Sequence, residues 1–505
     1  MLSDLLAGAG LLIAAAASAA AILLPPGRAR SAAMVLAMAL FPVLIAGDQW
    51  HTTQIVDLRH DEGRIVALLA IAAVAIGALT YAFRRWPILM PLAIIAALPF
   101  RVPLHAGGDS ANLLIPLYLV IVAAVVATVL RDWHLPGGGA DLGDHPDRDG
   151  GSKSGTGPAG ALTYVLAAIV VLYALQTLYS EDFSKGLQNV CFFFIPFTIA
   201  YRLLREVEWD RRLLTLTLIV LGVEASAFVL VGTVEWATRS LFWNDQIIRS
   251  NEFHTYFRVN SVFWDPNVYG RYLALVAVLA TAAMLWARTR SNFWVLTGLI
   301  AVLWFGLVPT YSQSSFLALL AGLAMLAAIR WSWRWTLVAV AVGTVGAALV
   351  ILFAGGSGKV TSDRLNVDLS GRGSLVSGGL RLFADKPIQG YGSGSFQAAY
   401  RQHRENKDAP VIVSHTEPVT VAAEQGLIGL LVYFALIVVA LWTLGRGLFD
   451  GRTDVARAAV LAAFVALLVH TLSYAGFFED PITWVLLAVG ASLALAEAPK
   501  VRDPA

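Results

Sequence analysis

A succession of apolar stretches, each about long enough to cross a bilayer as a helix, dominates this sequence. A transmembrane helix needs about 20 mostly apolar residues, and walking along the chain gives about fifteen candidates by that criterion. These are residues 5–24, 31–46, 64–83, 87–100, 111–130, 161–179, 185–204, 213–236, 266–287, 292–309, 312–329, 335–353, 419–443, 456–474 and 481–497. The pattern predicts an all-α polytopic membrane protein with about 14–15 transmembrane helices.

The overall composition leads to the same class. Hydrophobic residues make up 58% of the chain and charged residues 14%, against about 45–50% and about 25% in soluble proteins. A soluble chain of this kind would expose too much apolar surface. The formal net charge of +2 gives no case for nucleic acid as a partner. The single cysteine, Cys191, excludes a disulfide framework and a cysteine-based metal site within the chain.

Basic residues in short loops predict the orientation, because they favour the cytoplasmic side. If the N-terminus lies outside, every short inside connection carries arginine, and the C-terminal tail also falls inside. The inside arginines are then Arg28, Arg30, Arg84, Arg85, Arg131, Arg205, Arg211, Arg212, Arg288, Arg290, Arg330, Arg334, Arg446, Arg452 and Arg457. The outside turns at 47–63 and 474–481 are acidic or mixed.

Five regions follow from this organisation. Residues 1–131 hold the N-terminal spans, and residues 132–160 form a Gly-, Asp- and Pro-rich segment that is typical of a flexible linker, here cytoplasmic. Residues 161–353 hold the central spans with an outside loop at 237–265. Residues 354–418 form a long extracytoplasmic loop, and residues 419–505 hold the last spans.

Several arginines fall in the outside loops, against the general charge rule. Arg239, Arg249 and Arg258 lie in the loop at 237–265, and Arg372 and Arg381 lie in the loop at 354–418. Long loops translocate regardless of charge, so a solvated surface explains any one of them. The sharper interpretation is a site for an anionic ligand, because the planar arginine fork suits phosphate.

The long loop contains a distinctive stretch. Leu375, Leu380, Leu382 and Phe383 predict a short amphipathic helix on the bilayer surface, which Pro387 would end. The glycines that follow, Gly390, Gly392 and Gly394, predict a turn that brings the backbone close to another group. No βαβ unit surrounds them, so they are not a dinucleotide-binding fingerprint.

The end of this loop carries candidate catalytic groups. His415 directly precedes a predicted span and is a plausible general base, because imidazole titrates near neutral pH; a polar cap is the simpler interpretation. Glu417 follows it. Glu424 lies about two helical turns into the span, where a carboxylate is costly, and we expect an arginine or a polar cavity as its partner.

Together, these residues resemble the core pattern of the O-antigen ligase/O-antigen polymerase superfamily. The resemblance runs from Arg258 to Gly429. Its elements are Arg258 followed by Pro266-Asn267, Ser312-Gln313 at a helix start, Arg372, Pro387-x-x-Gly390-x-Gly392-x-Gly394-x-Phe396, His415, and Glu424-x-Gly426-x-x-Gly429.

The resemblance implies a metal-independent, inverting glycosyltransferase without a cofactor, with a GT-C-like membrane fold in the bacterial cytoplasmic (inner) membrane. Its donor would be a glycan on a polyprenyl (undecaprenyl) diphosphate, and its acceptor a hydroxyl on a glycan, a lipid or a protein. Arg258 and Arg372 would hold the diphosphate, with Arg381 beside them, and His415 would activate the acceptor. Glu417, Glu424, Gly390 and Gly392 would support the site.

This chain departs from the family pattern at two positions. Thr416 follows the histidine where family members often have asparagine, and Gln313 stands where they often have arginine. Gln313 supplies no charge, so we expect Arg381 or Arg249 to compensate if that position matters.

Two other functions stay open. A transporter or flippase for lipid-linked sugars would show inverted repeats and charges near the bilayer midplane; no internal repeat is apparent, but His470 and Glu424 lie inside spans. A non-catalytic membrane assembly protein would leave the arginines of the outside loops without a role.

Overall fold

A computed structural model describes residues 2–52, 56, 60–106, 109–134, 157–242, 244, 247–248, 251, 256–355, 360–403, 414–449 and 454–496. Side chains are described for these residues except 2–4, 103–112, 134, 158, 346–355 and 360–372. Arg249, and most of the predicted linker at 132–160, lie outside the described residues.

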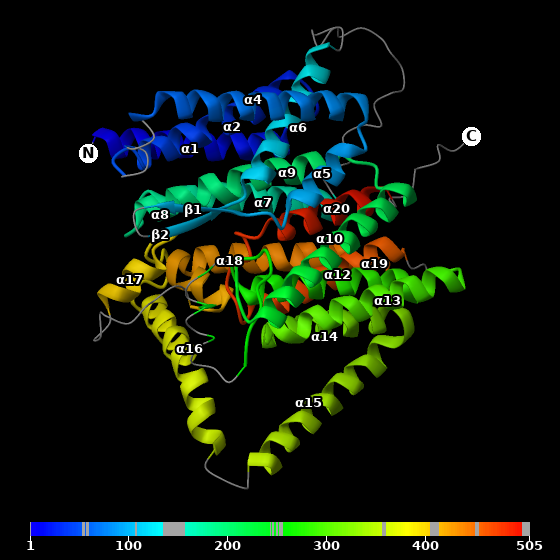
Figure 1. The fold of residues 1–505 in the computed structure, drawn as a ribbon. Coiled ribbons are helices and arrows are strands. Elements are labelled where there is room, and N and C mark those ends of the chain that lie inside the picture. The colour runs from blue at the N-terminus through cyan, green and yellow to red at the C-terminus, as the bar shows by residue number, and fades with distance from the viewer. Residues whose placement is uncertain are drawn as a thin grey trace.

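Helices account for nearly all of the described regular structure (Figure 1). The first part of the chain forms α1 (Leu2–Leu23), α2 (Arg28–Asp48), α4 (Glu62–Arg85), α5 (Leu89–Ala97), β1 (Val102–Ala106), β2 (Asp109–Leu113) and α6 (Ile115–His134). The middle part forms α7 (Pro158–Thr177), α8 (Phe183–Asn189), η1 (Val190–Phe194), α9 (Ile195–Arg205), α10 (Arg211–Thr238), α12 (Pro266–Leu285), α13 (Arg290–Leu307), η2 (Val308–Thr310), α14 (Gln313–Ala327), η3 (Ala328–Ser332) and α15 (Trp333–Gly355). The last part forms α16 (Val360–Asp385), α17 (Phe396–Gln402), α18 (Glu417–Gly445), α19 (Val455–Thr471) and α20 (Pro481–Ala496).

The predicted polytopic, helical membrane architecture is confirmed. Among the described residues, 11 helical segments are long and apolar enough to cross a membrane, and α19 and α20 are shorter apolar helices. The predicted count of about 14–15 spans treated α14 and α15 as separate, whereas the structure runs them together through the π-helical turn η3.

The predicted span at 87–100 is wrong as a transmembrane helix. Only the 9 residues of α5 are helical there, which gives about 14 Å at 1.5 Å per residue, against about 30 Å of hydrocarbon. The chain continues into β1, which pairs with β2 as an antiparallel hairpin from Val102↔Leu113 to Ala106↔Asp109. The predicted span at 111–130 therefore begins inside β2, and its helix starts at Ile115. Nothing in the apolar periodicity predicted this hairpin.

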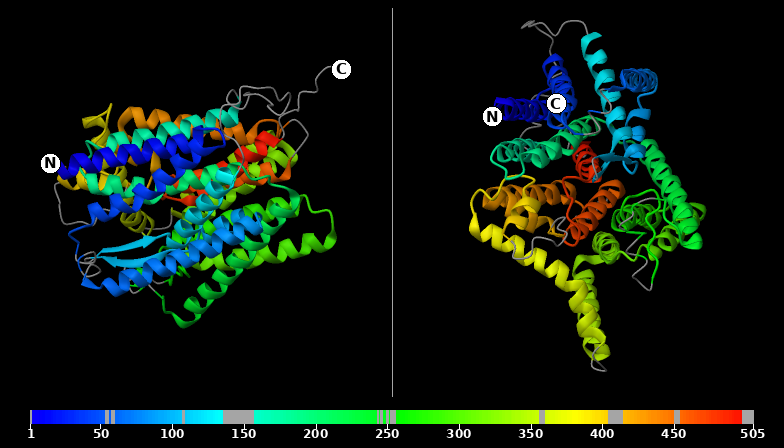
Figure 2. Two further views of the ribbon diagram at one scale, coloured as in Figure 1. Left: turned by 90° about the horizontal axis from the view of Figure 1, so that it is seen from above. Right: turned by 60° about the vertical axis from the view of Figure 1, so that its left-hand side comes forward.

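The two predicted sets of loops lie at opposite ends of the bundle, as the long helices show in Figures 1 and 2. At one end, Arg30 contacts both Glu206 and Asp132, which joins the α1–α2 connection to the ends of α6 and α9. At the other end, Lys386 pairs with Glu181 at 3.1 Å. Asp132 is buried near the end of α6, which runs to His134.

Aspartate side chains cap several of the long helices. Asp61 accepts a hydrogen bond from Arg64 N, Asp210 from Leu213 N and Asp265 from Asn267 N. Each cap satisfies a backbone N–H that the helix itself leaves unpaired and places a negative charge at the positive end of the helix dipole. These polar residues therefore fix where the apolar helices begin.

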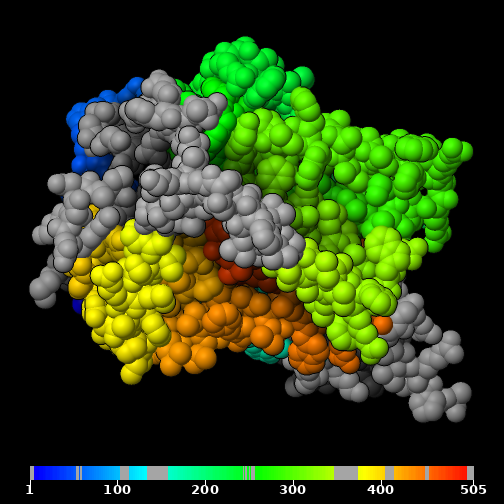
Figure 3. Space-filling model, turned by 90° about the horizontal axis from the view of Figure 1, so that it is seen from below, coloured from blue at the N-terminus to red at the C-terminus, as the bar shows by residue number. Residues whose placement is uncertain are grey.

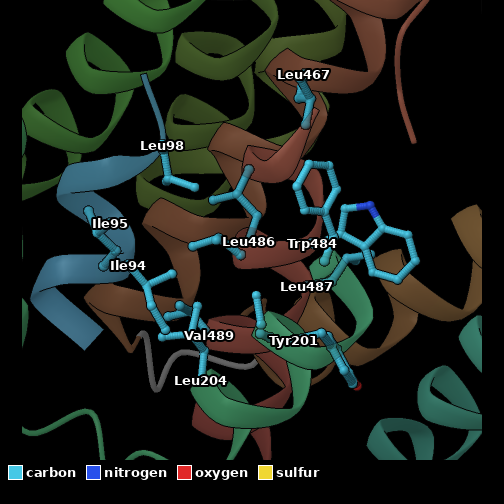
Figure 4. Packing of buried hydrophobic residues seen from close by; sticks show 14 of the residues in the cluster. Ile94, Ile95, Leu98, Tyr201, Leu204, Leu467, Trp484, Leu486, Leu487 and Val489 are labelled. Carbon is cyan, nitrogen blue, oxygen red and sulfur yellow. The ribbon is translucent and has the colours of Figure 1, made fainter. Parts of the chain in front are cut away.

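The core lies where α20 packs against neighbouring helices. Trp484 of α20 is 1% exposed, and its ring meets Phe194 at a centroid distance of 6.1 Å. Figure 4 shows Trp484 with Tyr201 and Leu204 of α9, Ile94 and Ile95 of α5, and Leu467 of α19. The indole N–H donates to Phe478 O at 3.0 Å, which satisfies its one polar group. This packing holds the segment before α20 in place, and that segment contributes to the site described below.

Two helices stand away from the bundle. α15 and α16 diverge from it in Figure 1, and the described side chains of α15 are mostly exposed, as expected for a lipid-facing helix. α16 ends at Asp385, two residues before Pro387, as predicted. Its Leu382 is buried with Tyr391, Phe396 and Tyr400, so this half of the helix packs on protein. From below, orange and red C-terminal segments are visible between α16 and α15 (Figure 3).

Candidate active site

Arg258 lies where two helices begin. Its Nε donates to Thr310 O at 2.9 Å, just before α14, and its Nη2 donates to Asn267 Oδ1 at 3.2 Å, in the first turn of α12. Asn251 fixes the Arg258 backbone through two hydrogen bonds of 3.0 Å. The guanidinium is therefore held between two helix N-termini, which both favour a bound anion.

The N-terminus of α14 is rich in hydroxyl groups and packs on α12. Ser312 Oγ lies 2.7 Å from Ser315 Oγ and 3.1 Å from Ser314 Oγ. Ser315 Oγ donates to Asn267 O at 3.3 Å. A Cβ on Gly270 would lie 2.7 Å from Ser315 Oγ, so only glycine lets the helices approach this closely. Gln313 itself is exposed.

His415 precedes α18 in a strained backbone conformation. Its φ of 63° is left-handed, which non-glycine residues adopt at a cost. Ser414 holds the turn: its hydroxyl donates to Thr416 O at 2.7 Å and lies 2.7 Å from Thr420 Oγ1. Strain that neighbouring contacts maintain is typical of functional positions, and the imidazole is only partly buried.

Glu417 connects the start of α18 to the segment between α19 and α20. Its Oε2 accepts hydrogen bonds from Gly476 N at 2.8 Å and Phe477 N at 3.1 Å. The same segment reaches α12, because Asp480 Oδ2 lies 2.7 Å from Arg271 Nη2. We call residues 472–480 the bridging loop, since it joins the helix that follows His415 to the helix that bears the Asn267 partner of Arg258.

Sequence reasoning noted His470 inside a span but missed the rest of the polar cluster around this loop. Arg271 is 3% exposed, and its guanidinium lies 5.9 Å from the centre of the Tyr474 ring. Burial raises the pKa of the Tyr474 hydroxyl. His470 is fully buried, with Nε2 3.2 Å from Ser314 Oγ. The available signal was an arginine and a histidine inside predicted spans, where charge is costly and usually functional.

The glycine-rich turn at residues 390–394 is bound to Glu424 of α18. Gly394 N and Phe396 N donate to the Glu424 carboxylate at 2.8 and 3.1 Å, and Gly392 N donates to Glu424 O at 2.8 Å. The partner of Glu424 is therefore backbone, and the expectation of an arginine or a polar cavity was wrong. Gly390 and Gly392 have φ of 68° and 95°. α18 is kinked at Gly426, where Leu427 N donates back to Pro387 O at 2.8 Å.

Of the other predicted arginines, the structure describes the side chain of Arg381 but not those of Arg372 and Arg249. Arg381 is exposed on α16 and makes no ion pair within the part of the chain that is described. Arg372 lies in α16, but its side chain is outside the described residues, as is the whole of Arg249. Arg271 lies close to the start of α14, because its neighbour Gly270 packs against Ser315.

A cavity of about 350 Å³ lies at the opposite end of the bundle. Its lining includes Glu206, Glu208, Asp210 and Arg131 beside apolar side chains of α5 and α9. Three carboxylates against one arginine do not suit an anionic ligand. We therefore place the candidate active site at the end of the bundle where α12, α14 and α18 begin, with Arg258 between the starts of α12 and α14 and His415 directly before α18.

Comparison with known proteins finds a match for part of the chain. No curated protein matches the chain. The family model described as O-antigen ligase matches residues 298–434, a segment that contains Arg372, Arg381, His415, Glu417 and Glu424 but not Arg258. The predicted resemblance is confirmed for this part of the chain. The similarity of residues 298–434 to O-antigen ligases supports a relationship to that superfamily and a membrane function of the same general type.

Proposed function

We propose that the protein transfers a glycan from a polyprenyl diphosphate, of the undecaprenyl type, to an acceptor hydroxyl outside the cytoplasmic membrane. The acceptor belongs to a second glycan, a lipid or a protein. One observation carries the proposal: Arg258 sits between the N-termini of α12 and α14, and the bridging loop joins α12 to the helix that follows His415.

The chemistry requires charge stabilisation on the leaving group and proton removal from the attacking group. The acceptor oxygen attacks the anomeric carbon, the bond from that carbon to the phosphate oxygen breaks, and the diphosphate leaves with the electron pair. Arg258 and the two helix N-termini stabilise the developing negative charge. His415 accepts the hydroxyl proton. A single displacement inverts the anomeric configuration, and no metal ion is needed for these steps.

Arg372 and Arg381 complete the proposed donor site from the side of α16, and Glu417, Glu424, Gly390 and Gly392 hold its frame. The site faces the extracytoplasmic side, with the N-terminus outside and the C-terminus cytoplasmic. This orientation is supported by the basic residues that gather at the opposite end of the bundle.

The test uses purified protein, a defined lipid-linked glycan and an acceptor. Mass spectrometry should detect the glycosylated acceptor and the released polyprenyl diphosphate. Arg258→Gln and His415→Ala should each abolish product, whereas Arg290→Gln, an exposed arginine at the opposite end, should not. Wild-type turnover in both Arg258→Gln and His415→Ala would refute the proposed roles of these two residues.

A transporter of lipid-linked sugars is the second candidate, and the buried charges of Arg271 and Asp480 favour it. The two functions are separated by the same reaction in sealed vesicles. Movement of the lipid-linked glycan across the bilayer without a new glycosidic bond would establish transport and exclude the transferase.

A further inference from the structure

Arg271 is a charged residue buried within the apolar helix α12. Its side chain is 4% exposed, in a segment with a mean hydropathy of 1.7 that is long enough to cross the membrane. An arginine at such a position is costly unless its charge and its donors are satisfied. Its contacts therefore indicate whether it serves structure or a ligand.

Those contacts use only part of the guanidinium. Nη2 lies 2.7 Å from Asp480 Oδ2, but Nε and Nη1 are buried and have no hydrogen-bond partner among the described residues. A purely structural ion pair gains most from the two parallel bonds of a fork-to-fork geometry. A buried charged donor without a partner costs about 1–3 kcal/mol or more. The arrangement therefore leaves two N–H positions for another acceptor.

The position of Arg271 relates it directly to Arg258. Asn267, which accepts from Arg258 Nη2, is four residues before Arg271 in the same helix, so both lie on one face. The rise between them is about 6 Å. A diphosphate presents anionic oxygens on two linked phosphorus atoms over a comparable length. Arg258 and Arg271 can therefore meet the two phosphates of one ligand.

The surroundings also favour an anion. The N-terminus of the 15-residue helix α14 meets α12 beside Arg271, at the contact of Gly270 with Ser315. The nearby carboxylates are engaged by backbone donors: Glu417 by Gly476 and Phe477, and Asp480 by Ile482 N at 2.9 Å. Their charges are thereby partly offset.

We propose that Arg271 is a second phosphate-binding residue, one helical turn beneath the contact between Arg258 and Asn267, and that it binds an anionic oxygen of the donor diphosphate. This inference rests on the proposed function. The competing explanation is that the pair of Arg271 and Asp480 only ties the bridging loop to α12.

The test measures binding without chemistry, with farnesyl diphosphate as the probe and the full chain in nanodiscs. Arg271→Gln should weaken binding of farnesyl diphosphate about tenfold or more, and should change binding of farnesyl monophosphate less than threefold. Asp480→Asn, which leaves the guanidinium intact, should bind the diphosphate at least as tightly as the wild type.

Arg202→Gln is the matched control. Arg202 is also buried in an apolar segment and is paired with Glu206 at 2.7 Å, but at the opposite end of the bundle. The Arg202→Gln variant should lower the unfolding temperature about as much as Arg271→Gln does, and should leave diphosphate binding unchanged. If Arg271→Gln does not fold, Asp480→Asn still tests the proposal, because freeing the guanidinium from its carboxylate partner should tighten diphosphate binding, whereas loss of a structural tie should weaken it.

Equal losses in Arg271→Gln and Asp480→Asn, with the double variant no worse than either, would show a structural tie and overturn the proposal. Failure of the proposed function can be distinguished from failure of this proposal. If the protein binds farnesyl diphosphate through Arg271 but forms no glycosidic bond, the Arg271 site stands and the transferase function is refuted. If the protein forms product and Arg271→Gln does not weaken diphosphate binding, the transferase function stands and the Arg271 site is refuted.

Discussion

Replacing Gly392 by alanine should disrupt the frame of the site. Gly392 has φ 95°, and a Cβ there would lie 2.2 Å from Ser180 Cα. The left-handed backbone costs alanine about 1–2 kcal/mol. Overpacking against backbone, which cannot rotate away, costs about 1–3 kcal/mol. Displacing the turn also weakens the 2.8 Å bond from Gly392 N to Glu424 O, a loss of about 1 kcal/mol.

Together these effects predict a destabilisation of about 3–6 kcal/mol. The assay is the thermal unfolding temperature of the purified protein in detergent, which should fall by about 5 °C or more. Gly373→Ala is the matched control, because Gly373 is exposed in helix α16 and nothing lies within 4 Å of its added Cβ. Alanine should raise helix stability there by about 0.5–1 kcal/mol. An unchanged unfolding temperature in Gly392→Ala would refute the packing of this turn.

Three further predictions concern named residues. Arg258→Lys keeps the charge but cannot reach both Thr310 O and Asn267 Oδ1, so kcat/KM for carrier release should fall about 100-fold; a loss below threefold would argue against a fork geometry. His415→Gly relieves the strain of the left-handed backbone at φ 63°. The unfolding temperature of this variant should therefore equal or exceed that of the wild type, while kcat falls about 100-fold or more. A marked drop in the unfolding temperature would instead indicate that the His415 side chain has a packing role. Gly322→Leu should destabilise the bundle by about 3 kcal/mol or more, because its Cβ would lie 2.5 Å from Val278 Cγ2, whereas Gly298→Leu, with nothing within 4 Å, should be tolerated in the same thermal assay.

Much of the membrane architecture could be predicted from sequence, because each span needs only length and apolarity. The helix α4 was predicted at 64–83 and forms at Glu62–Arg85, with Asp61 as its cap. The same criterion failed at α5. Its residues are as apolar as those of a span, but only 9 are helical before the chain extends into β1. Apolarity does not distinguish a short buried helix from a transmembrane one.

Parts of the site could be predicted because charge on the outside of a membrane protein is unusual. That argument identified Arg258, whereas His415 was singled out as an imidazole directly before a predicted span. The structure places both beside helix starts. The charge argument did not identify Arg271 or Asp480, since their pairing joins residues more than two hundred positions apart. Glu424 was singled out correctly as a residue that needs a partner, but its partners are backbone groups of Gly394 and Phe396, which no side-chain pattern reveals.

The bridging loop has a consequence for biosynthesis. It precedes the last helix, α20, whose packing around Trp484 holds it in place. Through Asp480 and the backbone at Gly476 it fixes Arg271 and Glu417, which belong to helices inserted earlier. A nascent chain that ends before this loop therefore lacks the partners of Arg271 and Glu417. We therefore expect the backbone contacts that hold Glu417 to form only after α20 has been synthesised and packed.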